Sequence, residues 1–251
     1  MAFAVFGDIH GNLEALEAIL KDIRKKRKKI QQTFFLGDAI TFGPDSSACL
    51  KLLQKHNVRC VIGNHEQRII RYDKSISEMN YAGIKHMEYV YNQLDNDDIR
   101  FIKSMPNEIT FDYHGRRFFF THYSHDFNGV VKEDLDAFSE VLLDKLFHGS
   151  DVDAVFFGHV HMRKLLINPA GRSYFCLGSS GCVKGDTTFY TYVDVGGTVK
   201  DNYDLYRIDV KYNRKKFVQK MIREPIPEKI KFAKKFWGID LLDEPTLANA
   251  E

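Results

Sequence analysis

Cysteines are few in this sequence, and none shows the Cys-x-x-Cys spacing of thiolate metal sites and redox motifs. Cys49, Cys60, Cys176 and Cys182 are expected to be reduced and mostly buried thiols, as in a cytoplasmic protein, rather than a disulfide framework. The N-terminal stretch lacks a basic segment, and its apolar run of about five residues is too short for a secretion signal or a membrane span. We therefore expect a cytoplasmic protein that does not use a membrane as a partner.

A strong excess of charge is also missing, because the formal net charge is only +2. Such a balance does not indicate a nucleic acid or an acidic partner. The local exception is a run of six basic residues, Arg24 to Lys29. It is either a patch for RNA or another anionic surface, or the solvated end of a helix, which favours cations. We prefer the second interpretation, because no aromatic residues interleave with the charges.

Linkers, internal repeats and low-complexity segments are not seen. With 251 residues and 44% hydrophobic content, the chain can bury one substantial core. We expect a single domain over residues 1–251, with a helical insertion at about 66–105 and a polar C-terminal tail at about 239–251.

The first part of the chain alternates strand and helix patterns. Strands are expected at 2–6, 33–36 and 59–62, with helices following the first two, and Asn12 is a plausible N-cap of the first helix. This order is typical of a parallel α/β layer, in which functional groups collect at the carboxyl ends of the strands.

The second part is expected to form a second sheet that faces the first. Helices are expected at 132–146 and 228–237. Short strands are expected at 108–113, 117–121, 154–157, 164–168, 174–177, 189–195, 203–210 and 216–222.

Five strand-end turns carry residues that bind metals. These turns are Gly7-Asp8-Ile9-His10, Gly37-Asp38, Gly63-Asn64-His65, Thr121-His122 and Gly158-His159-Val160-His161. A single turn of this kind has an ordinary explanation, since a lone buried histidine is usually a hydrogen-bonded core residue. Five turns of one design favour a metal centre instead. Its mixture of nitrogen and oxygen ligands, without thiolate, suits manganese, iron or zinc.

The set of turns resembles that of the calcineurin-like metallophosphoesterases, in the same order along the chain. The resemblance implies a four-layer α/β/β/α sandwich of two facing mixed sheets with two divalent or mixed-valence ions between them, Mn and Fe before Zn. It implies that the first ion is held by Asp8, His10, Asp38 and His161, and the second by Asp38, Asn64, His122 and His159. A hydroxide bridging the two ions would attack phosphorus, and His65 would act as the general acid.

The sequence departs from the protein phosphatase branch of that family at two positions. Thr41 stands in place of the aspartate that orients the catalytic histidine, and Phe42 in place of the arginine that grips phosphate. Because phenylalanine cannot form a bidentate clamp, protein phosphatase activity is not expected. The pattern resembles instead the small prokaryotic branch, which hydrolyses phosphodiesters and nucleotide polyphosphates. Asn12, Arg68 and His125 are candidate substrate contacts, although His125 is equally well explained as a surface residue.

The sequence thus predicts a dinuclear phosphoesterase that acts on small nucleotide-type substrates, such as diadenosine polyphosphates or ATP. One alternative is a non-catalytic scaffold on the same fold, which would be expected to have lost ligands. The others are a phosphomonoesterase or a nucleic-acid phosphodiesterase, the latter suggested by the basic run. The oligomeric state, the physiological substrate and the position of cleavage are left open.

Overall fold

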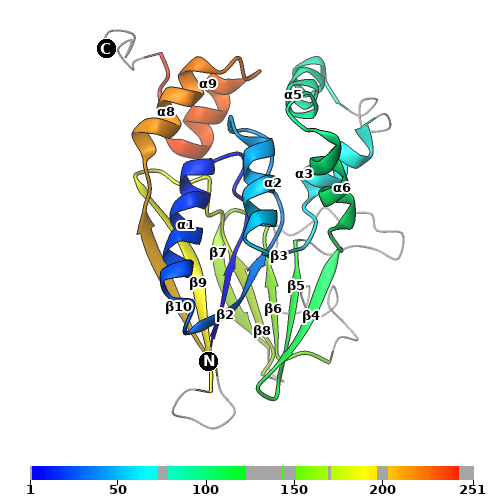
Figure 1. Ribbon diagram of the computed structural model, residues 1–251, viewed down its shortest axis with the longest axis vertical. Helices are drawn as coiled ribbons and strands as arrows, with labels where there is room; N and C mark the ends of the chain where they lie inside the picture. The colour runs from blue at the N-terminus through cyan, green and yellow to red at the C-terminus, as the bar shows by residue number, and fades with distance from the viewer. Residues whose placement is uncertain are drawn as a thin grey trace.

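Two five-stranded sheets face each other in the computed structural model, which describes residues 2–72, 79–122, 143, 151–168, 171–196 and 203–242 (Figure 1). The strands of the first sheet, in spatial order, are β10 (Tyr203–Lys211), β9 (Thr187–Val195), β1 (Ala2–Phe6), β2 (Ile30–Phe35) and β3 (Arg59–Cys60). β1, β2 and β3 are parallel, as expected, whereas β9 runs antiparallel to both β1 and β10. The sheet is therefore mixed.

The second sheet is mixed as well. Its strands, in spatial order, are β4 (Glu108–Tyr113), β5 (Arg116–Thr121), β6 (Ala154–Phe157), β8 (Ser173–Leu177) and β7 (Arg163–Ile167). β5, β6 and β8 are parallel, and the two outer strands are antiparallel to their neighbours. The expected pair of facing mixed sheets is confirmed.

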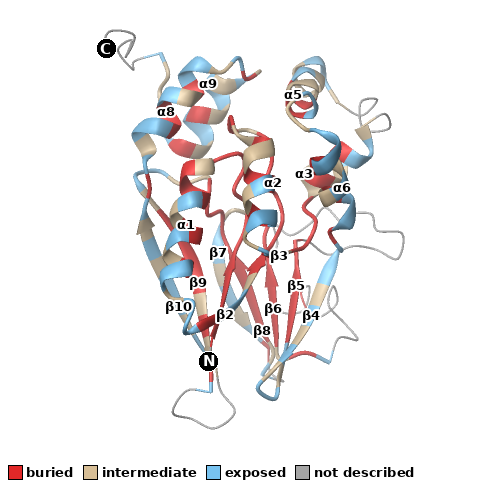
Figure 2. Ribbon diagram, viewed as in Figure 1, coloured by how far each residue is buried: buried red, intermediate tan, exposed pale blue. Residues whose placement is uncertain are grey.

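β1 lies at the centre of the first sheet and is buried on both faces (Figure 2). Phe3 and Val5 point into the apolar cluster between the sheets, and Ala4 and Phe6 into the cluster beneath the helices. Successive side chains of a strand point to opposite faces, so a strand covered on both sides reads as a continuous apolar run.

Helices α1 (Leu13–Lys25) and α2 (Ser46–Lys55) cover the outer face of the first sheet (Figure 1). The side chain of Asn12 accepts a hydrogen bond from the backbone N–H of Ala15, which confirms the predicted N-cap. The helix begins at the end of β1 and runs about 20 Å away from it, at 1.5 Å per residue. The basic run Arg24 to Lys29 therefore lies at the far end, where Lys26 pairs with Asp22.

The segment between β3 and β4 is helical, as expected, but it is divided. The helices described in it are α3 (Asn64–Ile70), α5 (Tyr81–Tyr91) and α6 (Asn96–Ser104). Asp95 caps α6 through the backbone N–H groups of Asp97 and Asp98. α3 and α6 lie beside the ends of β3 and β4, whereas α5 contacts the C-terminal helices, because the ring of His86 lies 4.8 Å from that of Phe232 in one of them (Figure 1).

The C-terminal region corrects two of the expectations. Residues 216–222 form part of a helix, α8 (Arg214–Arg223), rather than a strand, because Asn213 caps it and Phe217, Val218 and Met221 share one buried face at helical spacing. β9 and β10 join the first sheet rather than the second, since β9 pairs with β1. The expected terminal helix consists of α9 (Lys229–Phe232) and a π-helical turn, η2 (Ala233–Trp237).

The outer face of the second sheet is apolar. Phe119, Val155 and Tyr174 are buried there together with Leu143, the one described residue between 123 and 150. The helix expected at 132–146, which would form the fourth layer, otherwise lies outside the described residues. Among the helices of the described part of the chain, none has the length and apolar character needed to cross a bilayer.

Candidate metal centre

The strand-end turns of both sheets meet at one end of the space between them. Asp8 and His10 follow β1, Asp38 follows β2, and Asn64 begins α3 just after β3. His122 follows β5, while His159 and His161 follow β6. The structure brings together all seven side chains that the sequence singled out as metal ligands: Asp8, His10, Asp38, Asn64, His122, His159 and His161.

The backbone of these turns is strained. Asp8, His10, Asp38, His159 and His161 have φ angles between 50° and 71°, a region that residues other than glycine rarely adopt. Such strain costs on the order of 1–3 kcal/mol per residue and persists only where the surrounding structure imposes it, which is commonly at functional sites.

Two glycines allow the carboxylates to sit close to neighbouring backbone. A Cβ atom at Gly63 would lie 2.2 Å from Asp38 Oδ1, and one at Gly158 would lie 2.7 Å from Asp8 Oδ2. Any other residue at these two positions would displace a carboxylate from the centre.

The first group of ligand atoms lies around His10 and His161. Their Nε2 atoms are 2.9 Å apart, and Asp8 Oδ1 is 3.5 Å from His161 Nε2. His10 Nδ1 donates a hydrogen bond to the carbonyl oxygen of Ile40, 3.1 Å away. That bond leaves the lone pair of His10 on Nε2, the atom that faces the group.

The second group lies around Asn64. Its Oδ1 atom is 2.9 Å from His122 Nε2 and 2.9 Å from His159 Nδ1. Asp38 connects the two groups, because its Oδ2 atom is 3.3 Å from His122 Nε2 and 3.8 Å from His10 Nε2. His122 Nδ1 donates to the carbonyl oxygen of Leu36 at 2.6 Å, which turns Nε2 toward the centre.

The donor set suits divalent cations. Burial lowers the pKa of His10 to about 3, so its imidazole is neutral and can act as a ligand. Although burial opposes ionisation of Asp38, His122 and His65 hold the pKa of its carboxyl well below the usual range. Asp8 is fully buried, yet its Oδ2 has no hydrogen-bond partner within the described part of the chain. A buried, unpartnered carboxylate oxygen beside imidazole nitrogens is compensated when a cation binds.

His65 lies beside the two groups of ligand atoms, and each of its ring nitrogens has a polar neighbour. Its Nδ1 is 2.9 Å from Thr41 Oγ1, and its Nε2 is 3.9 Å from Asp38 Oδ2. Thr41 thus contacts His65 from the position at which the phosphatase branch has an aspartate. Burial lowers the pKa of His65 to about 3, and the nearby Asp38 carboxylate opposes that shift.

Glu66 is a residue whose role the sequence interpretation missed. Its carboxylate accepts hydrogen bonds from the backbone N–H groups of Asp38, Ala39, Ile40 and Gly63, at 2.8 to 3.3 Å. It therefore ties the turn after β2 to the start of α3. A signal was available, because a glutamate three residues after an N-cap has the spacing of a capping box.

The three expected substrate contacts have different surroundings. Asn12 is fully buried, and beyond its capping bond its Nδ2 donates to the carbonyl oxygen of Gly181 at 2.8 Å. Arg68 is exposed on α3, one turn beyond His65. His125 lies outside the described residues. Contact of any of the three with a substrate stays a prediction.

Aromatic rings border the centre on the side of the C-terminal helices. The half-buried ring of Phe42 lies 4.7 Å from the ring of His10 and 4.8 Å from that of His65, measured between centroids. Phe236 of η2 stacks on Phe42 at 4.6 Å and lies 5.7 Å from the ring of His161. Aromatic side chains therefore border the centre where the phosphatase branch has an arginine.

Comparison with known proteins agrees with this geometry. A family profile described as calcineurin-like phosphoesterase matches residues 1–163. The uncharacterized protein MJ0912 of Methanocaldococcus jannaschii is 26% identical over 247 residues, covering 90% of this chain and 93% of that protein.

Two solved structures share the fold over nearly the whole length. The hypothetical protein PH1004 of Pyrococcus horikoshii has a TM-score of 0.75 at 18% identity, covering 95% of this chain and 99% of that one. A metallophosphoesterase of Sphaerobacter thermophilus has a TM-score of 0.68 at 20% identity, covering 94% and 98%.

Proposed function

The chain belongs to the calcineurin-like phosphoesterase family, and we propose that it hydrolyses phosphodiester or phosphoanhydride bonds of small nucleotide-type substrates. As a member of that family it is a metal-dependent phosphoesterase, and its His and Asp side chains form groups that could hold metal ions. The identity of the ions and the class of substrate are the parts that we propose.

We assign the ligands as the family resemblance implies. Asp8, His10, Asp38 and His161 would hold one ion, and Asp38, Asn64, His122 and His159 the other. The short distances within each group and the position of Asp38 between them support the assignment. The nitrogen and oxygen donors suit Mn²⁺, Fe²⁺ or Zn²⁺.

The chain's own residues supply the rest of the chemistry. Bound divalent ions lower the pKa of a water molecule and neutralise the charge that develops on phosphate oxygens. His65 would donate a proton to the leaving oxygen through Nε2, while Thr41 holds Nδ1. An anionic phosphate near the ring raises the pKa of a histidine, so substrate binding itself would favour the protonated form of His65.

The aromatic border supports a nucleotide over a phosphoprotein. Phe42 offers no donor for a phosphate, whereas an arginine would offer a bidentate pair. Phe236, which is half-buried and stacks on Phe42, would instead offer its ring to a planar group, as aromatic rings prefer. A nucleobase attached to the scissile phosphate is such a group. Dinucleoside polyphosphates and ATP are therefore the substrates that we expect first.

The observation that carries the proposal is that the complete ligand set lies beside an oriented His65. A non-catalytic scaffold would not need either feature, and no candidate ligand has been lost. The basic run Arg24 to Lys29 does not support a nuclease, because α1 leads away from the centre. A cytoplasmic location belongs to the same proposal and is supported by four cysteines that are all free thiols.

An activity screen tests the proposal. The protein is stripped with a chelator and refilled with manganese, iron or zinc, then assayed on diadenosine polyphosphates, ATP, cyclic nucleotides, a chromogenic diester and simple monoesters. We expect activity to disappear on chelation and to return with metal, with nucleotide diesters or anhydrides preferred. Preference for monoesters would support a phosphomonoesterase, and activity on single-stranded RNA a nuclease. Inactivity with every metal would support the scaffold.

A further inference from the structure

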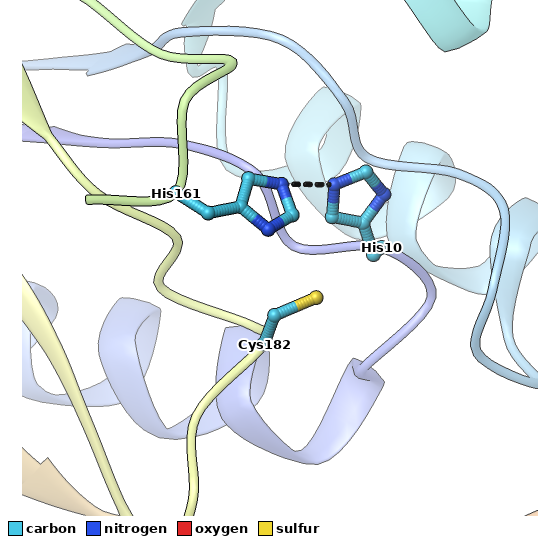
Figure 3. A group of neighbouring side chains, drawn as sticks. All are labelled: His10, His161 and Cys182. Carbon is cyan, nitrogen blue, oxygen red and sulfur yellow. Dashed lines mark hydrogen bonds between the residues drawn. The ribbon is translucent and has the colours of Figure 1, made fainter. Parts of the chain in front are cut away.

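Cys182 lies beside the first group of ligands, where the sequence gave no reason to expect a thiol. One ligand atom from each of His10, His161 and Cys182 lies within 4.8 Å of the other two. Figure 3 shows the sulfur directed toward the pair of imidazole rings, whose facing nitrogens are 2.9 Å apart. The three side chains come from the turn after β1, the turn after β6 and the segment between β8 and β9.

The backbone around Cys182 is fixed to the turn that carries Asp8 and His10. The N–H groups of Ser180 and Gly181 donate to the carbonyl oxygens of Gly7 and Asp8, both at 3.0 Å. A Cβ atom at Gly181 would lie 1.9 Å from the carbonyl oxygen of Ile9, so only glycine allows this approach. Cys182 follows this contact directly, and its position is set by it.

Side-chain hydrogen bonds also hold this segment, residues 179–182, in place. Ser179 Oγ donates to the carbonyl oxygen of Asp8 at 2.7 Å and accepts from the N–H of Cys182 at 2.8 Å. The carbonyl oxygen of Gly181 accepts from Asn12 Nδ2 at 2.8 Å and from Trp237 Nε1 at 2.7 Å. A ligand that is held in place before the metal binds costs little to order.

We propose that the Cys182 thiolate is a ligand of the first metal ion, together with His10 and His161. The inference rests on the proposed function, because it presupposes that an ion binds there. The fully buried carboxylate of Asp8 independently indicates a cation at this place, because its Oδ1 is 3.5 Å from His161 Nε2 and its Oδ2 has no hydrogen-bond partner among the described residues. When Sγ binds the ion, the thiol proton is released to solvent.

A thiolate changes which ion the first position prefers. Sulfur is a soft ligand that selects zinc, whereas carboxylate and water suit manganese and magnesium. The first position would therefore favour zinc over manganese. The second group, which has only nitrogen and oxygen donors in the described residues, would not share this preference.

Zinc X-ray absorption on the full-length protein tests the thiolate directly. The chelator-stripped chain is refilled with two equivalents of Zn²⁺ and compared with Cys182→Ser and Cys176→Ser. Cys176 is the matched control, because it is also a thiol near the centre but its Sγ contacts the carbonyl oxygen of Gly158. We expect a sulfur neighbour at about 2.3 Å from zinc in the wild type and in Cys176→Ser, and its loss in Cys182→Ser.

Metal binding gives a second readout that does not depend on activity. Zinc affinity at one position of Cys182→Ser should fall by at least about 10-fold, because even outer partners of metal ligands contribute 10–100-fold. Manganese binding should change little. Two zinc ions in the wild type with only nitrogen and oxygen neighbours would overturn the thiolate and leave the proposed metal centre intact. A wild type that binds no zinc would overturn both.

Discussion

The space between the two sheets has two ends with different side chains. We call them the aromatic end, around Phe3, and the metal end, where the strand-end turns carry the candidate metal ligands. At one end, Phe3 lies among aromatic rings, with centroid distances of 4.9 Å to Phe118, 5.6 Å to Phe34 and 5.8 Å to Phe120. At the other end, histidines and carboxylates face one another on strained turns. The same strands supply both ends, so a change of a few residues along each strand separates a core from a candidate metal centre.

The strained turns are held in place by the aromatic core. The aromatic end consists of regular strands, and burial of each large ring stabilises the fold by about 1.5–3 kcal/mol. The metal end buries polar atoms and holds residues at positive φ, both of which cost free energy. The aromatic end therefore stabilises the strands, and the strands hold the turns at the metal end in their strained conformation.

Replacing His65 with alanine should give the largest effect and should affect only the metal end. We expect turnover to fall by about 10²–10⁴-fold, because a positioned proton donor is lost. Metal content and the free energy of unfolding should change little, since His65 is not among the proposed ligands. Steady-state kinetics and elemental analysis measure both, with His56→Ala, at the end of α2, as the control. Undiminished turnover would remove His65 from the mechanism.

Replacing Phe3 with alanine should affect the opposite end. Its ring is fully buried, so we expect the free energy of unfolding to fall by about 3–5 kcal/mol. Denaturant titration measures this, and Leu165→Ala, on an exposed side chain of β7, should stay within about 0.5 kcal/mol of the wild type. If the folded Phe3→Ala protein had lost its metal affinity as well, the two ends would not be separable.

Thr41→Val should affect the metal end through the orientation of His65. Valine keeps the shape of threonine but cannot bond His65 Nδ1, so we expect turnover to fall by about 10- to 100-fold, matching a lost hydrogen bond of 1–3 kcal/mol. Thr41→Ser keeps the hydroxyl and should recover most of the turnover. Equal rates for the valine and serine variants would show that the hydroxyl does not orient His65.

The smallest change in stability is expected for His86 of α5, whose side chain contacts the turn that carries Phe42. Its Nε2 accepts a hydrogen bond from the N–H of Phe42, and burial lowers the pKa of His86 to about 4. Below pH 6.5 the His86 side chain takes up a proton in the unfolded chain but not in the folded one. The contribution of His86 to the free energy of unfolding is therefore progressively lost as the pH falls from 6.5 toward 4.

Between pH 7 and pH 5 that loss should amount to about 1–2 kcal/mol for His86. His86→Gln cannot titrate, so its free energy of unfolding should decline less than that of the wild type over the same interval. Denaturant titrations at the two pH values measure the difference. Parallel declines in both proteins would contradict the assignment.

Much of the arrangement could be predicted from local pattern. The parallel strands and the turns with Asp8, Asp38 and His159 follow from apolar runs that end in glycine and ligand residues, and those signals lie within a few neighbouring positions. The strand expected at 216–222 was wrong because Phe217, Val218 and Met221 are apolar in an order that a strand and a short helix share. The cap at Asn213 and the partner surface decide between the two.

The local order of residues sets where strands stop and which candidate metal ligands follow them, because periodicity and glycine placement act over short distances. Long-range packing sets the return of β9 and β10 to the first sheet, the link that Glu66 makes between two turns, and the position of Cys182 beside His10 and His161. These relations join residues that are far apart along the chain. They depend on packing and on backbone hydrogen bonds between turns, which no single stretch of sequence contains.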